Sequence, residues 1–380
     1  MPPSFAEARV DLGVISENVA VLRGRAQGAQ VMGVVKADGY GHGMIPAARA
    51  MLAGGATWLG TAFIEEALEL RGAGIQAPTV AWIIPPGAPL SAAIAADIDL
   101  GVSALWLLDE IATAAREAGR RARVHLKADT GLTRGGVTAA DWPDVVTAAA
   151  RAEAAGLLQV TGVWSHFACA DEPGHPSIAS QINVFHEALE VAEKGGLRPE
   201  VRHLANSPAT LTLPETHFDM VRTGIASYGI NPIPELTFPE LRPAMTLHTK
   251  IALVKRVPEG SGISYGHRYT TTRPSTLALI PLGYGDGIPR AATNLGPVLA
   301  AGLRRTIAGT VCMDQFVLDL GDDDAEAGDD AILFGPGDNG EPTAEEWAAA
   351  LGTIPYEIVT RISPRVPRVY VGGEQSPSSA

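Results

Sequence analysis

Cysteine is nearly absent from this 380-residue chain, which contains only Cys169 and Cys312. Two thiols cannot form a disulfide framework for a chain of this length, and we expect both to stay reduced. Basic residues are also in the minority, with 29 Lys and Arg against 42 Asp and Glu and a formal net charge of −13. Because nucleic acid is bound by a basic face, we predict that nucleic acid is not a partner.

Long apolar runs are missing as well. Pro, Gly or Asp interrupts each candidate before it reaches the length of a membrane span, so no membrane partner is predicted. The opening MPPSFAEARVDL has neither a basic start nor an apolar core, so no signal peptide is expected. We therefore predict a cytoplasmic protein, with a disordered tail from about residue 372.

From residue 31 to about 222, within a first domain predicted over residues 1–240, short β-branched or aromatic runs alternate with Ala-rich helical segments. Repeated βα units predict a parallel sheet, and eight of them in this length favour a (β/α)8 TIM-type barrel over an open sheet. The predicted strands span residues 31–36, 57–62, 79–84, 98–103, 123–129, 158–166, 201–206 and 218–224.

Residues 241–380 have a different texture, with short apolar runs separated by Gly, Pro and Asp. This pattern predicts a second, mostly β domain. One helix is expected from Thr343, where T-A-E-E before WAAAL has the form of a capping box. The acidic stretch 321–330 lacks the ligand spacing of a calcium loop, so no metal site is predicted.

The stretch VVKADGYGHG, residues 34–43, carries a lysine at the end of an apolar strand. Poor solvation at such a position favours the neutral, nucleophilic amine of Lys36. Tyr40 offers a phenol, and Gly39, Gly41 and Gly43 are expected to let the backbone approach a ligand. Taken alone, an ordinary strand end with a Gly-rich turn explains the stretch equally well.

Other strand ends carry polar residues that would meet Lys36 at one face of a barrel. They are Lys127, Asp129, Ser165, His166, His203, Asn206, Ser207, Arg222, Thr223 and Gly224. Asn206–Ser207 and Gly224–Ile225 follow the last two strands, where barrels often bind phosphate through backbone N–H groups. A lysine nucleophile beside a phosphate site points to pyridoxal phosphate held as a Schiff base.

A series of motifs extends this reading over nearly the whole chain. They are VVKADGYGHG, KADTGLTRGG (127–136), SHFACAD (165–171), NSPATL (206–211), VRTGIASYG (221–229), SYGHRY (264–269), GYGDG (283–287), VCMDQ (311–315) and PYEIVTRISPRVPR (355–368). In this number and order they resemble alanine racemase, a family that joins a pyridoxal-phosphate barrel to a C-terminal β domain. Many relatives read Asn-Ala where this chain has Asp38-Gly39, and neither position supplies a catalytic group.

The resemblance implies a set of cofactor contacts. Lys36 corresponds to the Schiff-base lysine, Arg222 to the partner of the pyridine nitrogen, and His166 to the residue that supports this arginine. Because arginine stays protonated, it donates to an unprotonated nitrogen, which limits side reactions such as transamination. The phosphate contacts correspond to Tyr40, Ser207, Gly224, Ile225 and Tyr356, with Asn206 adjacent.

The resemblance also implies how the Cα proton moves. One base cannot reach both faces of a fixed substrate, so two are needed, and these correspond to Lys36 and Tyr265. In the family the tyrosine reaches the partner subunit's site, which implies a homodimer with shared sites. A phenol needs a neighbouring cation to act as a base at neutral pH, and Arg134 corresponds to that cation and to a carboxylate ligand. Met313 and Tyr284 correspond to substrate contacts.

Lys127 matches a position where family members often carry a carbamylated lysine, because a carbamate would orient Arg134. An ordinary ion pair with Asp129 is the alternative. The implied activity is interconversion of L-alanine and D-alanine for peptidoglycan in a bacterial cytoplasm. Three other interpretations stay open here: a broad-specificity racemase for small amino acids, a related decarboxylase, and a non-catalytic pyridoxal-phosphate-binding protein.

Overall fold

The predicted strands of the first domain form one parallel sheet that curls into a nearly closed barrel. A computed structural model of the chain describes residues 5–373. The barrel strands are β2 (Gln30–Val34), β3 (Trp58–Thr61), β4 (Thr79–Ala81), β5 (Asp99–Val102), β6 (Ala122–Lys127), β7 (Leu158–Trp164), β8 (Val201–His203) and β9 (Met220–Thr223). At the seam between β8 and β9, the N–H of Arg222 donates to Ala205 O at 2.9 Å. The predicted (β/α)8 fold is confirmed.

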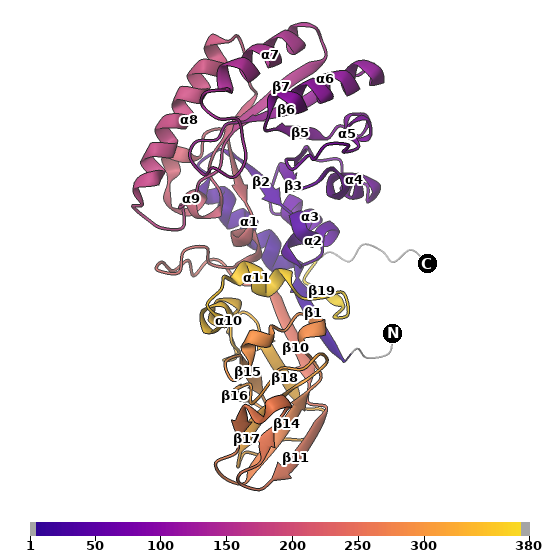
Figure 1. Cartoon of the computed structure of the whole chain (residues 1–380), viewed down its shortest axis with the longest axis vertical. Coiled ribbons are helices and arrows are strands. Elements are labelled where there is room, and N and C mark those ends of the chain that lie inside the picture. The colour runs from indigo at the N-terminus through magenta and orange to yellow at the C-terminus, as the bar shows by residue number, and fades with distance from the viewer. Residues whose placement is uncertain (1–4, 374–380) are drawn as a thin grey trace.

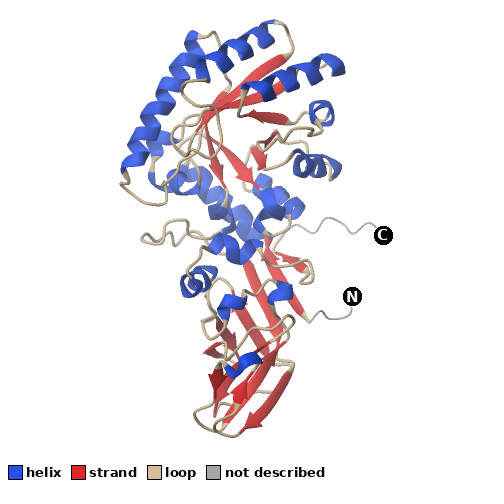
Figure 2. Ribbon diagram, viewed as in Figure 1, coloured by secondary structure: helices blue, strands red, loops and turns tan. Residues whose placement is uncertain are grey.

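Helices cover the outside of this sheet (Figure 2). They are α1 (Leu12–Arg25), α3 (Met44–Ala53), α4 (Ile64–Gly72), α5 (Leu90–Ala95), α6 (Leu105–Ala118), α7 (Trp142–Ala154), α8 (Pro176–Lys194) and α9 (Ser207–Thr212). In α6, Leu107, Leu108, Ile111 and Ala115 recur at helical spacing and are buried on one face. The helix ends at Gly119, whose left-handed conformation (φ 60°) suits a residue without Cβ.

The second domain is mostly β, as predicted, and lies at the other end of the long axis (Figure 1). One sheet has the order β16-β15-β18-β10-β1-β19, and a smaller sheet has the order β11-β14-β17. Their strands after residue 240 are β10 (Met245–Lys250), β11 (Leu253–Val257), β14 (Ser275–Ile280), β15 (Pro297–Ala300), β16 (Leu303–Thr306), β17 (Phe316–Gly321), β18 (Asp330–Phe334) and β19 (Arg368–Val371). A separate hairpin pairs β12 (Gly262–Ile263) with β13 (Tyr269–Thr270).

Two helices follow in this domain. The predicted capping box is present at α10 (Ala344–Leu351), where Thr343 Oγ1 accepts from the N–H of Glu346 and the Glu346 carboxylate accepts from the N–H of Thr343. α11 (Pro355–Thr360) was not predicted, and it packs against the segment that begins at Lys36.

The first strand crosses the division drawn from the sequence at residue 240. β1 (Ala6–Asp11) pairs antiparallel with β10 and parallel with β19, so it lies in the sheet of the second domain. Figure 1 shows this indigo strand beside β10, which is drawn in a colour from much later in the chain. The second domain therefore contains strands from both the beginning and the end of the chain. The tail predicted from about residue 372 lies, from residue 374 onward, outside the described residues.

Among residues 5–373, none of the helices is both long and apolar enough to cross a bilayer.

Candidate functional site

Lys36 follows β2 directly and begins a backbone segment with unusual conformation. The next four residues, 37–40, all have left-handed φ values of 52–60°, although only one of them is glycine. Such a run is unfavourable for residues with a Cβ and persists only where the surroundings enforce it. Here the Glu66 carboxylate accepts from the N–H of Ala37 at 2.8 Å, and Asp38 Oδ1 accepts from the N–H of Met44 at 2.8 Å. The lysine is therefore anchored on a rigid turn at the carboxyl end of the strand.

Gly41 and Gly43 of this segment allow residues of the second domain to pack closely against it. A Cβ at Gly41 would lie 2.3 Å from Val359 O, and a Cβ at Gly43 would lie 2.0 Å from the Tyr370 hydroxyl. Arg368 Nε also donates to Gly41 O at 2.9 Å. The expectation that these two glycines make room for a ligand is wrong, because the carboxyl-terminal part of the chain occupies that space.

The five predicted phosphate contacts lie together at the barrel mouth, the region around the carboxyl ends of the barrel strands. The Tyr40 ring is 6.2 Å from the Tyr356 ring, and a Cβ at Gly224 would lie 2.4 Å from Tyr40 Oη. Ser207 Oγ accepts from the N–H of Gly224 at 2.9 Å, and Ile225 is the next residue in the chain. Burial raises the pKa of both Tyr40 and Tyr356, so their phenols stay protonated and can donate to an anionic oxygen.

Asn206 lies next to this group at the start of α9. Its Oδ1 accepts from the N–H of Ala209 at 3.2 Å and caps α9. The structure thus gives Asn206 the ordinary capping role that a strand-end asparagine often has.

Four cations gather at the barrel mouth of a chain that is acidic overall. Burial and the charge of Arg134 lower the pKa of Lys36, opposed by Glu66. Burial, then Arg134 and Arg222, lower the pKa of Lys127 to about 8. The Lys127 Nζ lies 4.7 Å from the centre of the Trp164 ring. This excess of positive charge suits a ligand that carries more than one anionic group.

Arg222 is buried, with 4% of its surface exposed, and points its guanidinium into the barrel mouth region. Its Nη2 donates to His166 Nδ1 at 3.0 Å and to Ser165 O at 2.8 Å. Burial lowers the pKa of Arg222 to about 9, so it stays protonated at neutral pH. Burial and then the Arg222 charge hold the pKa of His166 well below its usual value, so His166 accepts as a neutral imidazole.

The other predicted residues lie on the second domain. Tyr265, Tyr284 and Met313, which we call the Tyr265 surface, are 75%, 44% and 54% exposed. Thr310 Oγ1 donates to Tyr265 O at 2.7 Å, and the N–H of Gly285 donates to Met313 O at 2.8 Å. An open cavity of about 400 Å³ beside the tyrosine is lined by residues 264–267, Leu279, Cys312 and residues 315–317. The cation–π contacts of Lys36 within the described residues are to Tyr40 and Trp82, not to this surface.

Sequence reasoning missed several residues that hold the site. Glu66 supports the turn after Lys36, and Trp164 packs against both Lys127 and Arg222. Asp99 and His125 were also missed, although each is a polar residue next to apolar strand residues, Asp99 at the start of β5 and His125 between Val124 and Leu126 of β6. A buried charge in such a strand is the one signal that could have found them.

Comparison with known proteins covers both domains. The family descriptions "alanine racemase, N-terminal domain" and "alanine racemase, C-terminal domain" match residues 10–232 and 244–370. An alanine racemase from Thermobifida fusca is 67% identical over 369 residues, covering 97% of this chain and 99% of that protein. One from Streptomyces coelicolor is 61% identical, covering 96% of each. The crystal structure of alanine racemase from a D-cycloserine-producing Streptomyces lavendulae superposes with a TM-score of 0.97 at 60% identity, covering 98% of each chain.

Proposed function

This chain belongs to the alanine racemase family, and from that premise we propose that it interconverts L-alanine and D-alanine using pyridoxal phosphate and two bases. The observation that carries the proposal is the cation-rich barrel mouth around Lys36, combined with a second group of family residues exposed on the other domain. The bases are Lys36 and the Tyr265 of a partner subunit.

The residues of the barrel mouth fit the cofactor. The Gly224 backbone, where a Cβ would collide with Tyr40 Oη, leaves a cradle beside a phenolic donor for the phosphate. Arg222 is held by neutral acceptors, and as a group that only donates it would hold the ring nitrogen of the cofactor. Lys36 would hold the aldehyde carbon. When bound, pyridoxal phosphate withdraws electron density from the substrate Cα and makes its proton removable.

Lys36 moves the proton on one face of the substrate. Its lowered pKa increases the neutral fraction of the amine near neutral pH, so Nζ can accept the Cα proton. The strained turn after Lys36 fixes where the side chain begins and so helps to aim it. On the opposite face, Tyr265 Oη donates or accepts the second proton, with Arg134 beside the substrate carboxylate.

The Tyr265 surface supports a shared site. Aromatic and methionine side chains this exposed are typical of protein interfaces. In a homodimer, each Tyr265 surface covers the barrel mouth of the other subunit, so that Met313 and Tyr284 limit the substrate side chain to about a methyl group. This arrangement excludes water from the reacting carbon and brings the two bases to opposite faces of it.

We propose that Lys127 is carbamylated. The lowered pKa of about 8 gives the neutral amine that reacts with carbon dioxide. An unmodified ammonium would repel Arg134, whereas a carbamate accepts from it and orients it toward the substrate carboxylate. The same activity in a bacterial cytoplasm would supply D-alanine for peptidoglycan.

Racemisation and the absorbance of the purified protein test this function together. We expect a yellow protein that converts either alanine enantiomer to the racemate, and a reduced cofactor covalently attached to the Lys36 peptide after borohydride treatment. A panel of other amino acids with a carbon dioxide assay checks for broader racemisation and for decarboxylation. A protein that takes up pyridoxal phosphate on Lys36 but leaves both enantiomers unchanged would overturn the proposal.

A further inference from the structure

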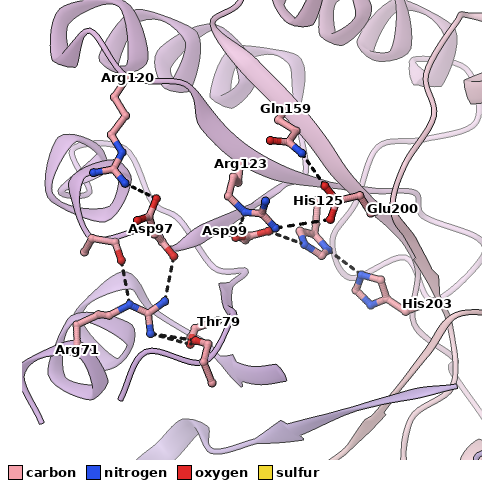
Figure 3. A network of polar contacts seen from close by, with 12 residues as sticks. Arg71, Thr79, Asp97, Asp99, Arg120, Arg123, His125, Gln159, Glu200 and His203 are labelled. Atoms are coloured by element: carbon pink, nitrogen blue, oxygen red, sulfur yellow. Dashed lines mark hydrogen bonds and ion pairs between the residues drawn. The ribbon is translucent and has the colours of Figure 1, made fainter. Parts of the chain in front are cut away.

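A chain of buried polar side chains crosses the barrel below Arg222. Arg222 Nη1 lies 3.2 Å from His203 Nδ1, His203 Nε2 lies 2.9 Å from His125 Nδ1, and His125 Nε2 lies 3.1 Å from Asp99 Oδ2. Asp99, His125 and His203 are each at most 1% exposed. Figure 3 shows these three side chains in line across β5, β6 and β8. We call this series the relay.

The two ends of the relay determine its proton positions. A guanidinium only donates, so His203 Nδ1 must accept from Arg222 and His203 carries its proton on Nε2. A carboxylate only accepts, so His125 Nε2 must carry a proton toward Asp99. The remaining bond then runs from His203 Nε2–H to His125 Nδ1. Every bond points from Arg222 to Asp99, and both imidazoles are neutral.

The barrel wall is adapted to hold this relay. Between β6 and β7, Val124 pairs with Val160 but His125 pairs with Gly162, so Thr161 is an extra residue opposite the histidine. A bulge of this kind re-aims a neighbouring side chain. A Cβ at Gly162 would lie 2.2 Å from His125 Nδ1, so the glycine leaves room for the ring. Asp99 is fixed from its other side by Arg123 Nε at 2.8 Å.

Charge explains why the relay extends as far as a carboxylate. The hydrogen-bond partners of the Arg222 guanidinium in residues 5–373 are two imidazoles and the carbonyls of Ser165 and Leu204, and none of them is negative. A buried cation without compensation is unfavourable. Burial opposes ionisation of Asp99, but His125 and Arg123 outweigh it and hold the pKa of Asp99 below its usual value, so this end of the relay stays negative.

We propose that Asp99, His125 and His203 are positioning residues that hold the Arg222 guanidinium at the pyridine nitrogen and compensate its charge from the opposite side of the barrel. The inference rests on the proposed function, in which Arg222 faces the cofactor ring. It adds three residues that touch neither cofactor nor substrate. A merely space-filling polar core would need neither the fixed proton order nor the negative end.

Neutron diffraction from deuterated crystals of the full-length protein tests the proton order without any substitution. We expect deuterons on Nε2 of both His125 and His203, and none on either Nδ1. A deuteron on Nδ1 of either ring would overturn the relay. This result does not depend on turnover: if the protein fails to racemise alanine, the proposed function fails while the deuteron positions still decide the relay.

Removal of the negative end tests its effect on the cofactor. Asp99→Asn keeps an acceptor for His125 but removes the charge, whereas Asp97→Asn removes an exposed charge two residues away and is the matched control. With pyridoxal phosphate labelled at the ring nitrogen, we expect Asp99→Asn to shift the nitrogen resonance and to weaken cofactor binding about tenfold. Asp97→Asn should change neither.

Equal behaviour of the two variants would overturn the charge compensation. Gly162→Ala provides a second substitution, because its methyl group would displace the His125 ring while the amino acids of the relay stay unchanged. It should shift the same ring-nitrogen resonance, and an unshifted resonance would also count against the relay. If Asp99→Asn does not fold, Gly162→Ala and the neutron structure decide.

Discussion

The barrel mouth and the Tyr265 surface carry the two halves of the proposed chemistry, and they differ in how firmly they are held. At the barrel mouth Tyr40 and Arg222 are buried, and backbone N–H groups donate to the carboxylates of Glu66 and Asp38. On the second domain, Tyr265 is 75% exposed and its backbone carbonyl, not its hydroxyl, accepts a hydrogen bond from Thr310. The first group is enclosed by other residues of its own chain, while the side chains of the second are largely open to solvent within residues 5–373.

The difference indicates what positions the functional side chains at the barrel mouth and at the Tyr265 surface. In the barrel this positioning comes from buried contacts between elements far apart in sequence, including α11 against the turn after Lys36. At the Tyr265 surface, the proposed function takes it from contact with a partner subunit, which would also bury the exposed Met313. The experiments below probe this contrast, beginning with the largest expected effect.

Lys36→Ala should cause the greatest loss, because it removes both the covalent attachment and one base. We expect racemisation to fall by about 10⁴-fold or more, together with the absorbance of the bound cofactor. Absorbance spectra before and after borohydride reduction, with a D-alanine assay, measure both effects. A persistent reducible chromophore would mean that another lysine holds the cofactor.

Tyr265→Phe should cost about 10²–10⁴-fold in rate and leave cofactor absorbance unchanged, because only the exposed half loses its acid–base group. Deuterium exchange at Cα separates the two faces, since Lys36 still exchanges one of them. Near-normal rates in both directions would remove this tyrosine from the mechanism. Tyr284→Phe, on the same surface, is the control for general disturbance.

Mixing the two inactive variants tests whether the halves belong to different chains. Random exchange between Lys36→Ala and Tyr265→Phe subunits places one intact site in each mixed dimer, so roughly a quarter of the wild-type sites should return. Mass spectrometry of differently labelled subunits confirms the exchange. If exchange is complete and activity stays absent, the halves are not shared between subunits.

Gly41→Ala should weaken the contact between the two domains. Its Cβ would meet Val359 O at 2.3 Å in a backbone with φ of 81°, and we expect a loss of about 2–4 kcal/mol in stability. Gly119→Ala is the control, with positive φ but open space around it, and should cost about 1–2 kcal/mol. Urea midpoints at fixed protein concentration compare them. Equal midpoints would show that the close approach contributes little.

The smallest effect concerns the modification of Lys127. Only the neutral amine reacts, and its pKa is about 8, so at constant dissolved carbon dioxide the carbamate signal should grow as the pH rises through about 8 and decline below it. Carbon-13 NMR in labelled bicarbonate measures this signal. Lys127→Arg should abolish it, whereas Lys194→Arg, at an exposed lysine of α8, should not. A signal that survives Lys127→Arg would assign the carbamate elsewhere.

Local patterns in the sequence were enough to predict much of the barrel. Each strand is a short β-branched run bounded by turn residues, and each helix repeats its apolar residues along one face, so periodicity alone identified eight βα units. The same logic placed Lys36, His166 and Arg222 at strand ends, and the motifs then suggested their roles. The capping box at Thr343 was equally readable, because all its atoms lie within one helical turn.

Only the tertiary structure decided the contacts between distant segments. The left-handed turn after Lys36 depends on Glu66, the space at Gly41 is filled by Val359, and β1 joins a sheet whose other strands begin at residue 245. The sequence by itself determined the elements and the chemical groups, because both follow from near neighbours along the chain. It could not determine which distant groups lie together in a buried space. Their proximity produces the strained turn after Lys36, the lowered pKa values at the barrel mouth and the relay from Arg222 to Asp99.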